Sequence, residues 1–152
     1  MMDDGRLEVE AALQISKPVD RVFEAIVDPA EMTNYFISRS SGRLIEGEQV
    51  TWGFPEFEAD FPITVDKVVK DSFVSFYWEV DGEMLHVEIT LSPVDGGSTV
   101  VTITEKSREN DEAGILWLRG NTAGWANFLA CLKAYLEYGI NLRKGAFDFL
   151  RK

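Results

Sequence analysis

The sequence predicts an α+β domain in which a curved antiparallel sheet of six to seven strands wraps around a long C-terminal helix. Short runs of alternating apolar residues recur between residues 37 and 105, and turn-forming residues separate them. This pattern is typical of consecutive antiparallel strands. The segment 124–139 instead repeats its apolar residues at helical spacing, at Trp125, Phe128, Leu129, Leu132 and Leu136. Such a helix must bury this stripe, and the preceding strands offer the surface.

The N-terminal part predicts one strand followed by two short helices. Residues 7–15 alternate loosely between apolar and polar, as a half-buried strand does. Ser16 is a suitable N-cap and Pro18 suits the first turn of the helix that follows. That helix ends before Pro29, because the residue preceding a proline avoids the α region. A second short helix is expected at residues 30–34.

The middle of the chain predicts the remaining strands. Residues 37–45, rich in Ser and Arg, form the weakest of them. The others are expected at 49–54, 61–69, 74–80, 85–91 and 99–105. The strand at 61–69 should contain a slip of register near its middle. Asp81-Gly82 predicts a hairpin, because a type I′ turn needs positive φ at both central positions.

The C-terminal third predicts a loop, a break and then the long helix. Residues 106–114 are polar and read as a loop, while 115–118 are a short apolar piece of undefined form. Gly120-Asn121-Thr122 offers a break and an N-cap before the helix at 124–139. We expect a single domain spanning residues 1–152, with 140–152 as a C-terminal extension.

Net charge and composition exclude several classes of partner. The formal net charge is −11, from 26 acidic and 15 basic residues. A chain this acidic is poorly suited to nucleic acid or to anionic lipid surfaces, because both are bound by basic clusters. No apolar run approaches the length of a membrane span, and a single cysteine cannot form an internal disulfide. We therefore expect a cytoplasmic protein with no nucleic-acid or membrane partner, as a monomer or weak dimer.

Three segments carry a resemblance to a known family. Residues 16–26 (SKPVDRVFEAI) resemble the first helix of the START-like, or SRPBCC, superfamily, and 28–36 resemble its second short helix. Residues 124–136 resemble the C-terminal helix of the branch related to the activator of Hsp90 ATPase (AHSA1-like). The resemblance implies a helix-grip fold with a hydrophobic cavity between sheet and long helix. The superfamily includes lipid carriers, hormone and polyketide binders, cyclases and the co-chaperone domain itself.

Large aromatic residues are the candidates for lining such a cavity. The chain has ten Phe and four Trp, and rings of this size either fill a core or wall a pocket. The aromatic candidates for the ligand cavity are Tyr35, Trp52, Phe54, Phe61, Phe76, Trp78, Trp117, Trp125 and Phe128. For any single one of them, simple core packing is the alternative.

Glu105 is the candidate polar residue of the cavity. If Val101 and Ile103 face the core, Glu105 shares their face and points at the cavity mouth, where it could act as a base or bind a ligand hydroxyl. The opposite register, with Val100 inward, would place Glu105 in water.

The remaining reactive side chains do not form a recognisable catalytic set. His86, the only histidine, alternates with apolar residues and is expected to face solvent, with a catalytic role as the alternative. Cys131 is expected to be a buried, inert thiol. One His and one Cys cannot assemble a zinc site of the usual ligands. The sequence contains no nucleophile-elbow or phosphate-binding glycine motif, and we predict no metal and no cofactor.

The leading functional prediction is binding of a small hydrophobic or aromatic molecule, lipid-, polyketide- or flavonoid-like. Two alternatives stay open. One is an interaction or stress-response module resembling the Hsp90 activator, with a chaperone partner. The other is a cyclase or hydrolase that uses Glu105 with Tyr35 or His86.

Overall fold

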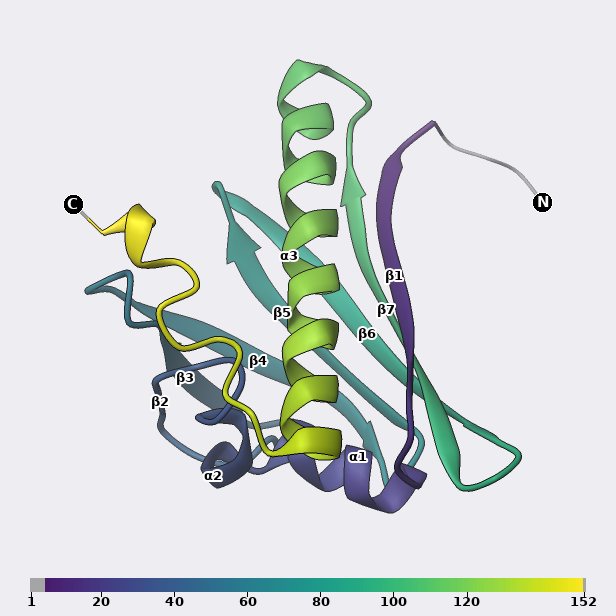
Figure 1. Cartoon of the computed structure of the whole chain (residues 1–152). Coiled ribbons are helices and arrows are strands. Elements are labelled where there is room, and N and C mark those ends of the chain that lie inside the picture. The colour runs from purple at the N-terminus through teal and green to yellow at the C-terminus, as the bar shows by residue number, and fades with distance from the viewer. Residues whose placement is uncertain (1–4, 152) are drawn as a thin grey trace.

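The protein, described here by a computed structural model for residues 5–151, forms one seven-stranded antiparallel sheet with its helices on one side (Figure 1). The order of strands across the sheet is β1-β7-β6-β5-β4-β3-β2. The elements are β1 (Leu7–Ile15), α1 (Val19–Val27), α2 (Pro29–Met32), β2 (Arg39–Ser40), β3 (Gln49–Gly53), β4 (Asp60–Val69), β5 (Phe73–Val80), β6 (Glu83–Val94), β7 (Ser98–Arg108), α3 (Glu112–Tyr138) and a short 3₁₀ helix η1 (Asp148–Leu150). The predicted α+β helix-grip architecture is confirmed.

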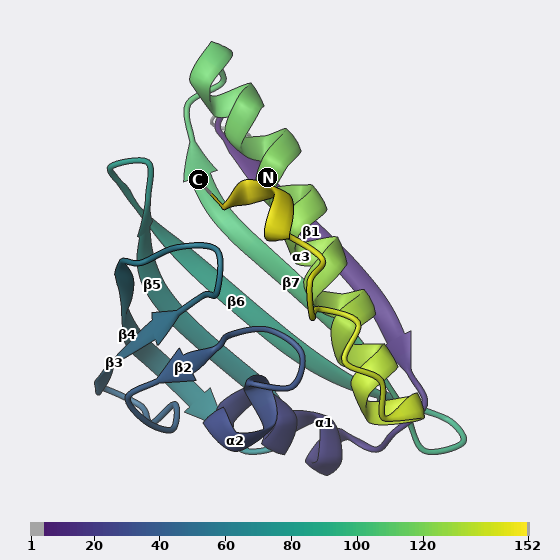
Figure 2. The same cartoon turned by 60° about the vertical axis from the view of Figure 1, so that its left-hand side comes forward.

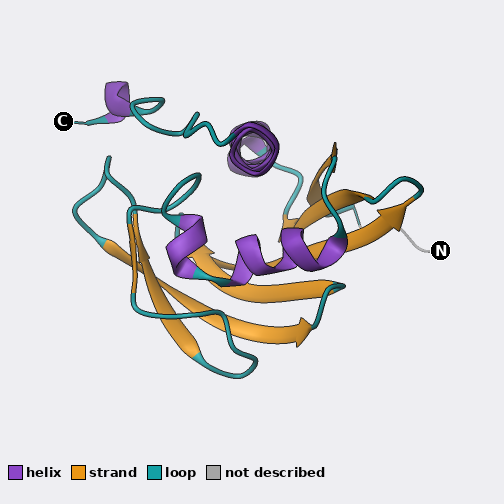
Figure 3. Ribbon diagram, turned by 60° about the horizontal axis from the view of Figure 1, so that its bottom comes forward, coloured by secondary structure: helices purple, strands orange, loops and turns teal. Residues whose placement is uncertain are grey.

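The sheet is strongly curved, and its concave side holds α1, α2 and α3 (Figures 2 and 3). Helix α3 packs mainly on β1 and touches β7, so it covers one half of this concave side. The C-terminal segment that follows α3 turns away from it toward the other half, near β3 and β4 (Figures 1 and 3). Residues of the strands, of α3 and of this segment line one cavity, which is described below.

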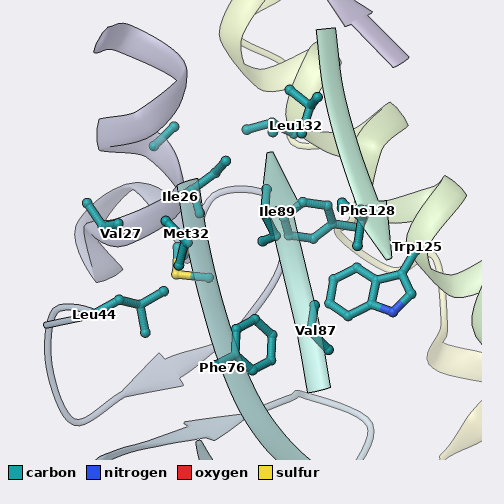
Figure 4. Packing of buried hydrophobic residues seen from close by; sticks show 14 of the residues in the cluster. Ile26, Val27, Met32, Leu44, Phe76, Val87, Ile89, Trp125, Phe128 and Leu132 are labelled. Atoms are coloured by element: carbon teal, nitrogen blue, oxygen red, sulfur yellow. The ribbon is translucent and has the colours of Figure 1, made fainter. Parts of the chain in front are cut away.

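Alternation along the strands places the core as the sequence predicts. In β6, Leu85, Val87, Ile89 and Leu91 are all buried and face the helices. Val87 and Ile89 lie beside residues of α3 such as Trp125 and Phe128 (Figure 4), and all four belong to the same core cluster. The register of β4 against β5 shifts between Val65 and Lys67, which confirms the predicted slip. Asp81 and Gly82 both have positive φ, 51° and 81°, which confirms the hairpin turn.

The predicted loop at 106–114 and the predicted start of the long helix are wrong. Strand β7 continues to Arg108, so the loop predicted at 106–114 is reduced to a few residues. Helix α3 begins at Glu112, and residues 115–118 are its first turns. Asp111 is the N-cap, and its side chain accepts a hydrogen bond of 2.7 Å from the backbone N–H of Gly114.

The break predicted at residues 120–122 does not exist, because α3 runs straight through it. Glycine inside a helix costs about 1 kcal/mol relative to alanine. Tertiary packing offsets that cost: Trp117, one turn earlier, is only 3% exposed and anchors this part of α3. The helix ends as predicted at Gly139, whose φ of 66° is the left-handed conformation that closes many helices.

The strand predicted at 37–45 is also mostly wrong. Only Arg39 and Ser40 pair with β3, and the following residues form a loop. Leu44 in this loop is buried, and its backbone N–H donates to Val27 O at 3.1 Å. An apolar residue that anchors a loop produces the same sequence pattern as one side of a short strand.

Candidate functional site

A cavity of about 540 Å³ lies between the curved sheet, α3 and the C-terminal segment. Nine of its nineteen lining residues are aromatic, and four charged residues also contribute to it. The lining residues are Tyr35, Phe36, Phe54, Glu56, Phe57, Phe61, Trp78, Glu79, Val80, Asp81, Asn121, Gly124, Trp125, Asn127, Phe128, Cys131, Arg143, Phe147 and Leu150. Phe57 and Leu150 are 46% and 42% exposed and lie at its rim.

Six of the ten predicted cavity residues line this space: Tyr35, Phe54, Phe61, Trp78, Trp125 and Phe128. The other four, Trp52, Phe76, Glu105 and Trp117, are buried but are not part of the lining. Trp52 and Phe76 form a layer directly behind the wall, since the ring of each lies within 6.1 Å of the Trp78 ring. These rings support the wall by packing.

Phe36, which the sequence interpretation did not single out, is central to the aromatic wall. Its ring meets Phe128 edge-on with the centroids 4.7 Å apart, Phe54 at 5.3 Å and Trp52 at 5.4 Å. Edge-to-face contacts of this kind favour a fixed arrangement of rings. Phe36 thus joins the sheet side of the cavity to α3.

Glu105 faces inward and is completely buried. Of the two registers left open by the sequence, the structure selects the one with Val101 and Ile103 in the core. The carboxylate accepts three hydrogen bonds, all from neutral donors. Trp78 Nε1 donates to Oε2 at 2.7 Å, and Asn121 Nδ2 and Trp117 Nε1 donate to Oε1 at 2.6 and 3.2 Å. Glu105 therefore lies behind the wall and fixes two of its residues, Trp78 and Asn121.

The groups that a Glu105-based enzyme would need are not gathered. Tyr35 donates its hydroxyl proton to Ala25 O at 2.7 Å, and burial raises the pKa of this hydroxyl well above its ordinary range. His86 lies on the outer face of the sheet, since its neighbour Val87 is the residue that pairs with Glu105. The imidazole stacks on Tyr77, and its Nε2 is 3.2 Å from Asp66 Oδ2, so it is half-buried rather than open to solvent.

An ion pair under the C-terminal segment was not predicted. Arg143 Nη2 donates to Glu56 Oε1 at 2.5 Å, and the two side chains are 14% and 2% exposed. The guanidinium also lies over the ring of Phe147, 4.6 Å from its centroid. The other carboxylate oxygen of Glu56, Oε2, is buried and has no hydrogen-bond partner among the described residues. This pair attaches the C-terminal segment to the loop between β3 and β4.

Comparison with known proteins assigns the chain to a family. The sequence model of the family described as "Activator of Hsp90 ATPase homolog 1-like protein" matches residues 16–137. The chain belongs to this AHSA1-like family. A search of the curated proteins found no match.

Solved structures agree with the AHSA1-like assignment. The protein SSP2350 from Staphylococcus saprophyticus is 31% identical, with a TM-score of 0.78 over 90% of this chain and 96% of that one. DynU16, a protein in the dynemicin biosynthetic locus, is 26% identical, with a TM-score of 0.79; the match covers 92% of this chain and 49% of DynU16. The Aha1 dimer from Colwellia psychrerythraea shares the fold at 17% identity, with a TM-score of 0.75 over 88% of this chain and 98% of that one.

The AHSA1-like chain has one further reactive group in the cavity wall. Cys131 is 5% exposed, and burial raises the pKa of its thiol. Within residues 5–151, no three His, Cys, Asp or Glu side chains are grouped so that they could hold a metal ion. Nor is any helix of that part of the chain long and apolar enough to span a membrane.

A second hollow in this AHSA1-like domain lies against α1 and is lined mostly by charged residues. Its central charges are already paired. Arg21 donates to both carboxylate oxygens of Glu31 at 2.5 and 3.1 Å, and Tyr135 of α3 donates to the same carboxylate. Burial opposes ionisation of Glu31, but the hydrogen bonds from Arg21 and Tyr135 outweigh it and lower the pKa. This network joins α1 and α2 to α3 and is structural in character.

Proposed function

We propose that this AHSA1-like domain binds a small apolar or aromatic molecule in the cavity between the sheet and α3. The observation that carries the proposal is the aromatic wall formed by Phe36, Trp78, Trp125 and Phe128 around a volume of about 540 Å³. Ligand sites in proteins are mostly apolar cavities of roughly 300–1,000 Å³. Burying a flat ring here would remove apolar surface from water on both partners, at about 25 cal/mol per Å².

The class of ligand follows from the chemistry of the wall. An aromatic and apolar lining suits lipid-, polyketide- or flavonoid-like molecules with planar or extended apolar parts, because such parts can pack on its rings. The similarity to DynU16, a protein in the dynemicin biosynthetic locus, supports the same class of ligand.

Gly124 allows a test in which the cavity is filled without disturbing the fold. It lines the cavity, and a Cβ added at this position would meet nothing within 4 Å. Gly124→Phe should therefore occupy the space that a ligand would take. Gly120→Phe is the matched control, because it is on the same helix, also has open space and does not line the cavity.

Binding is measured by titrating flavonoid-like, polyketide-like and fatty-acid ligands while following Trp fluorescence. We expect a saturable change in the wild type and in Gly120→Phe, and none in Gly124→Phe. The proposal fails if no ligand class changes the Trp signal of the wild type, or if Gly124→Phe binds as well as Gly120→Phe does.

A second candidate function is stimulation of an Hsp90-type ATPase. The matched family description favours it, and α3 exposes Ile115 and Leu116 near its start, where a protein partner could dock. Adding the protein to a purified Hsp90 homologue and measuring ATP turnover tests this candidate. If the protein does not stimulate ATP turnover, this second candidate function is excluded. If Gly124→Phe still stimulates ATP turnover, the stimulation does not depend on ligand binding in the cavity.

A further inference from the structure

We propose that the C-terminal segment, residues 140–151, is a lid over the cavity that the ion pair between Arg143 and Glu56 holds closed, and that ligands enter and leave when it lifts. This inference rests on the proposed function and concerns how the same cavity opens. Three observations carry it: the position of the segment, its weak attachment to the rest of the fold, and the place of the ion pair that holds it.

The C-terminal segment forms one side of the cavity. Arg143, Phe147 and Leu150 all contribute to the lining. The segment leaves α3 at Gly139 and runs toward β3 and β4 (Figures 1 and 3). The match to the family model ends at residue 137, so the segment lies beyond the part of the chain that the model matches. Movement of the segment would open this side of the cavity while the sheet and α3 stay in place.

Few contacts attach the segment to the rest of the protein. Arg143 and Phe147 are half-buried, the other residues of 140–151 are exposed, and none of them belongs to the hydrophobic core cluster. From residue 141 on, every backbone hydrogen bond of the described segment joins two of its own residues, such as Ala146 N–H to Arg143 O at 3.0 Å. Segments with few buried apolar contacts and only local hydrogen bonds open at a low cost in free energy.

Arg143 is the side chain that holds the segment against the sheet side of the cavity. Its Nη2 donates to Glu56 Oε1 at 2.5 Å, and its guanidinium lies 6.0 Å from the centroid of the Phe54 ring. The guanidinium also covers the ring of Phe147, 4.6 Å from its centroid, and so orders the segment itself. Loss of the Arg143–Glu56 contact would therefore release the segment from the loop between β3 and β4.

The Arg143–Glu56 pair can separate because opening hydrates both partners. Glu56 has a side chain only 2% exposed, although residues 55 and 57–59 around it are exposed. Its Oε2 has no hydrogen-bond partner among the described residues. When the segment lifts, water supplies that partner and offsets part of the lost ion pair. The closed position is thus favoured without being locked, as a lid requires.

Rates of ligand exchange test the lid. The probe is N-phenyl-1-naphthylamine, whose fluorescence rises in an apolar site, and its binding and release are followed by stopped flow. Arg143→Met removes the charged contact and keeps a long side chain. We expect the association and dissociation rate constants both to rise about tenfold or more, the factor that a hydrogen bond between charged groups contributes to an equilibrium. Because a lid gates both directions, Kd should change little.

Arg151→Met is the matched control for the exchange rates. It makes the same substitution in the same segment, but Arg151 does not line the cavity and pairs with Asp148 within the segment. Both rate constants should stay at their wild-type values.

Tryptic cleavage tests the opening itself, without a ligand. Trypsin cuts after Arg143 and Lys144 when this part of the chain lifts away from the fold, so the cleavage rate follows the population of the open state. Glu56→Met breaks the ion pair and leaves the sequence of the segment unchanged. We expect cleavage there to be about tenfold faster than in the wild type. Glu58→Met, an exposed position of the same loop outside the lining, should not change it.

The outcomes separate the lid from the proposed function. If the probe binds but Arg143→Met exchanges it within about twofold of the rates of Arg151→Met, the lid is wrong and the cavity function stands. A rise in the dissociation rate alone also overturns the lid, since loss of a direct ligand contact acts mainly on dissociation. Unchanged cleavage in Glu56→Met would show that the ion pair does not hold the segment. If the probe does not bind the wild type, the proposed function itself fails.

Discussion

Replacing Glu105 with glutamine tests whether the buried carboxylate organises the cavity wall. Glutamine has the same length and shape, but only one of its two terminal atoms accepts hydrogen bonds. If the amide oxygen occupies the position of Oε1, it keeps the bonds from Trp117 and Asn121. The amide NH₂ group then faces Trp78 Nε1 at 2.7 Å, donor against donor.

The size of the effect follows from these contacts. A hydrogen bond to a charged group contributes about 1.5–3 kcal/mol, and one such bond, to Trp78, is lost. The two remaining bonds weaken, because a neutral acceptor binds its donors roughly half as strongly. Removing a buried charge offsets part of this loss. We expect a net destabilisation of about 2 kcal/mol, which lowers the Tm of a domain this size by about 4–8 °C.

Urea unfolding followed by Trp fluorescence measures the change, and the indole N–H resonances of Trp78 and Trp117 report on the local contacts. Glu88→Gln is the matched control. It removes the same charge from the outer face of β6, where Glu88 pairs with the exposed Lys106 at 3.1 Å. Exposed ion pairs of this kind contribute little, so we expect a change within about 0.5 kcal/mol.

The reasoning is refuted if Glu105→Gln also stays within about 0.5 kcal/mol of the wild type, as judged against the usual spread of surface substitutions. Unmoved resonances of both indole N–H groups would show in addition that the carboxylate does not fix the two rings.

Three further predictions concern the fold around the cavity. Leu132→Ala, at a fully buried position of α3, should destabilise by about 2–5 kcal/mol in urea unfolding, and a loss under about 1 kcal/mol would contradict the packing described. Gly114→Ala should destabilise measurably, because its Cβ would lie 1.9 Å from a backbone oxygen; an unchanged Tm would contradict this close approach. The hydrogen bonds from Arg21 and Tyr135 lower the pKa of Glu31 in the folded protein. Glu31 should therefore stabilise the fold at a pH above its ordinary pKa of about 4.3. This contribution is lost as the pH falls through the lower pKa that Glu31 has in the folded protein. The stability difference between wild type and Glu31→Gln should therefore shrink in acid, and a difference that grows in acid would reverse the assigned sign.

Much of the sheet could be predicted because each strand carries its own pattern. The alternation in β5 and β6, the turn at Asp81-Gly82 and the slip in β4 are local features that the chain encodes within a few residues. The predictions failed where local signals were ambiguous. Gly120 suggested a break, yet the packing of Trp117 holds the helix through it.

The candidate site was predictable only in part, for a related reason. Periodicity identifies which rings face inward, but not which of them reach the cavity and which lie one layer behind. Trp78 and Trp52 both face inward, and only Trp78 lines the space. The pairing of Glu56 with Arg143 joins residues 87 positions apart, and no spacing in the sequence indicates it.

Local sequence is enough to specify the alternating faces of the strands and the apolar stripe of the long helix. It also shows that Glu105 lies on the same strand face as Val101 and Ile103. Those features depend on side-chain periods of two and 3.6 residues, which any short segment displays. The three neutral donors around Glu105 and the position of the C-terminal segment over the cavity emerge only when the chain is folded. Both depend on the curvature of the sheet and on contacts between distant segments, which local periodicity does not encode.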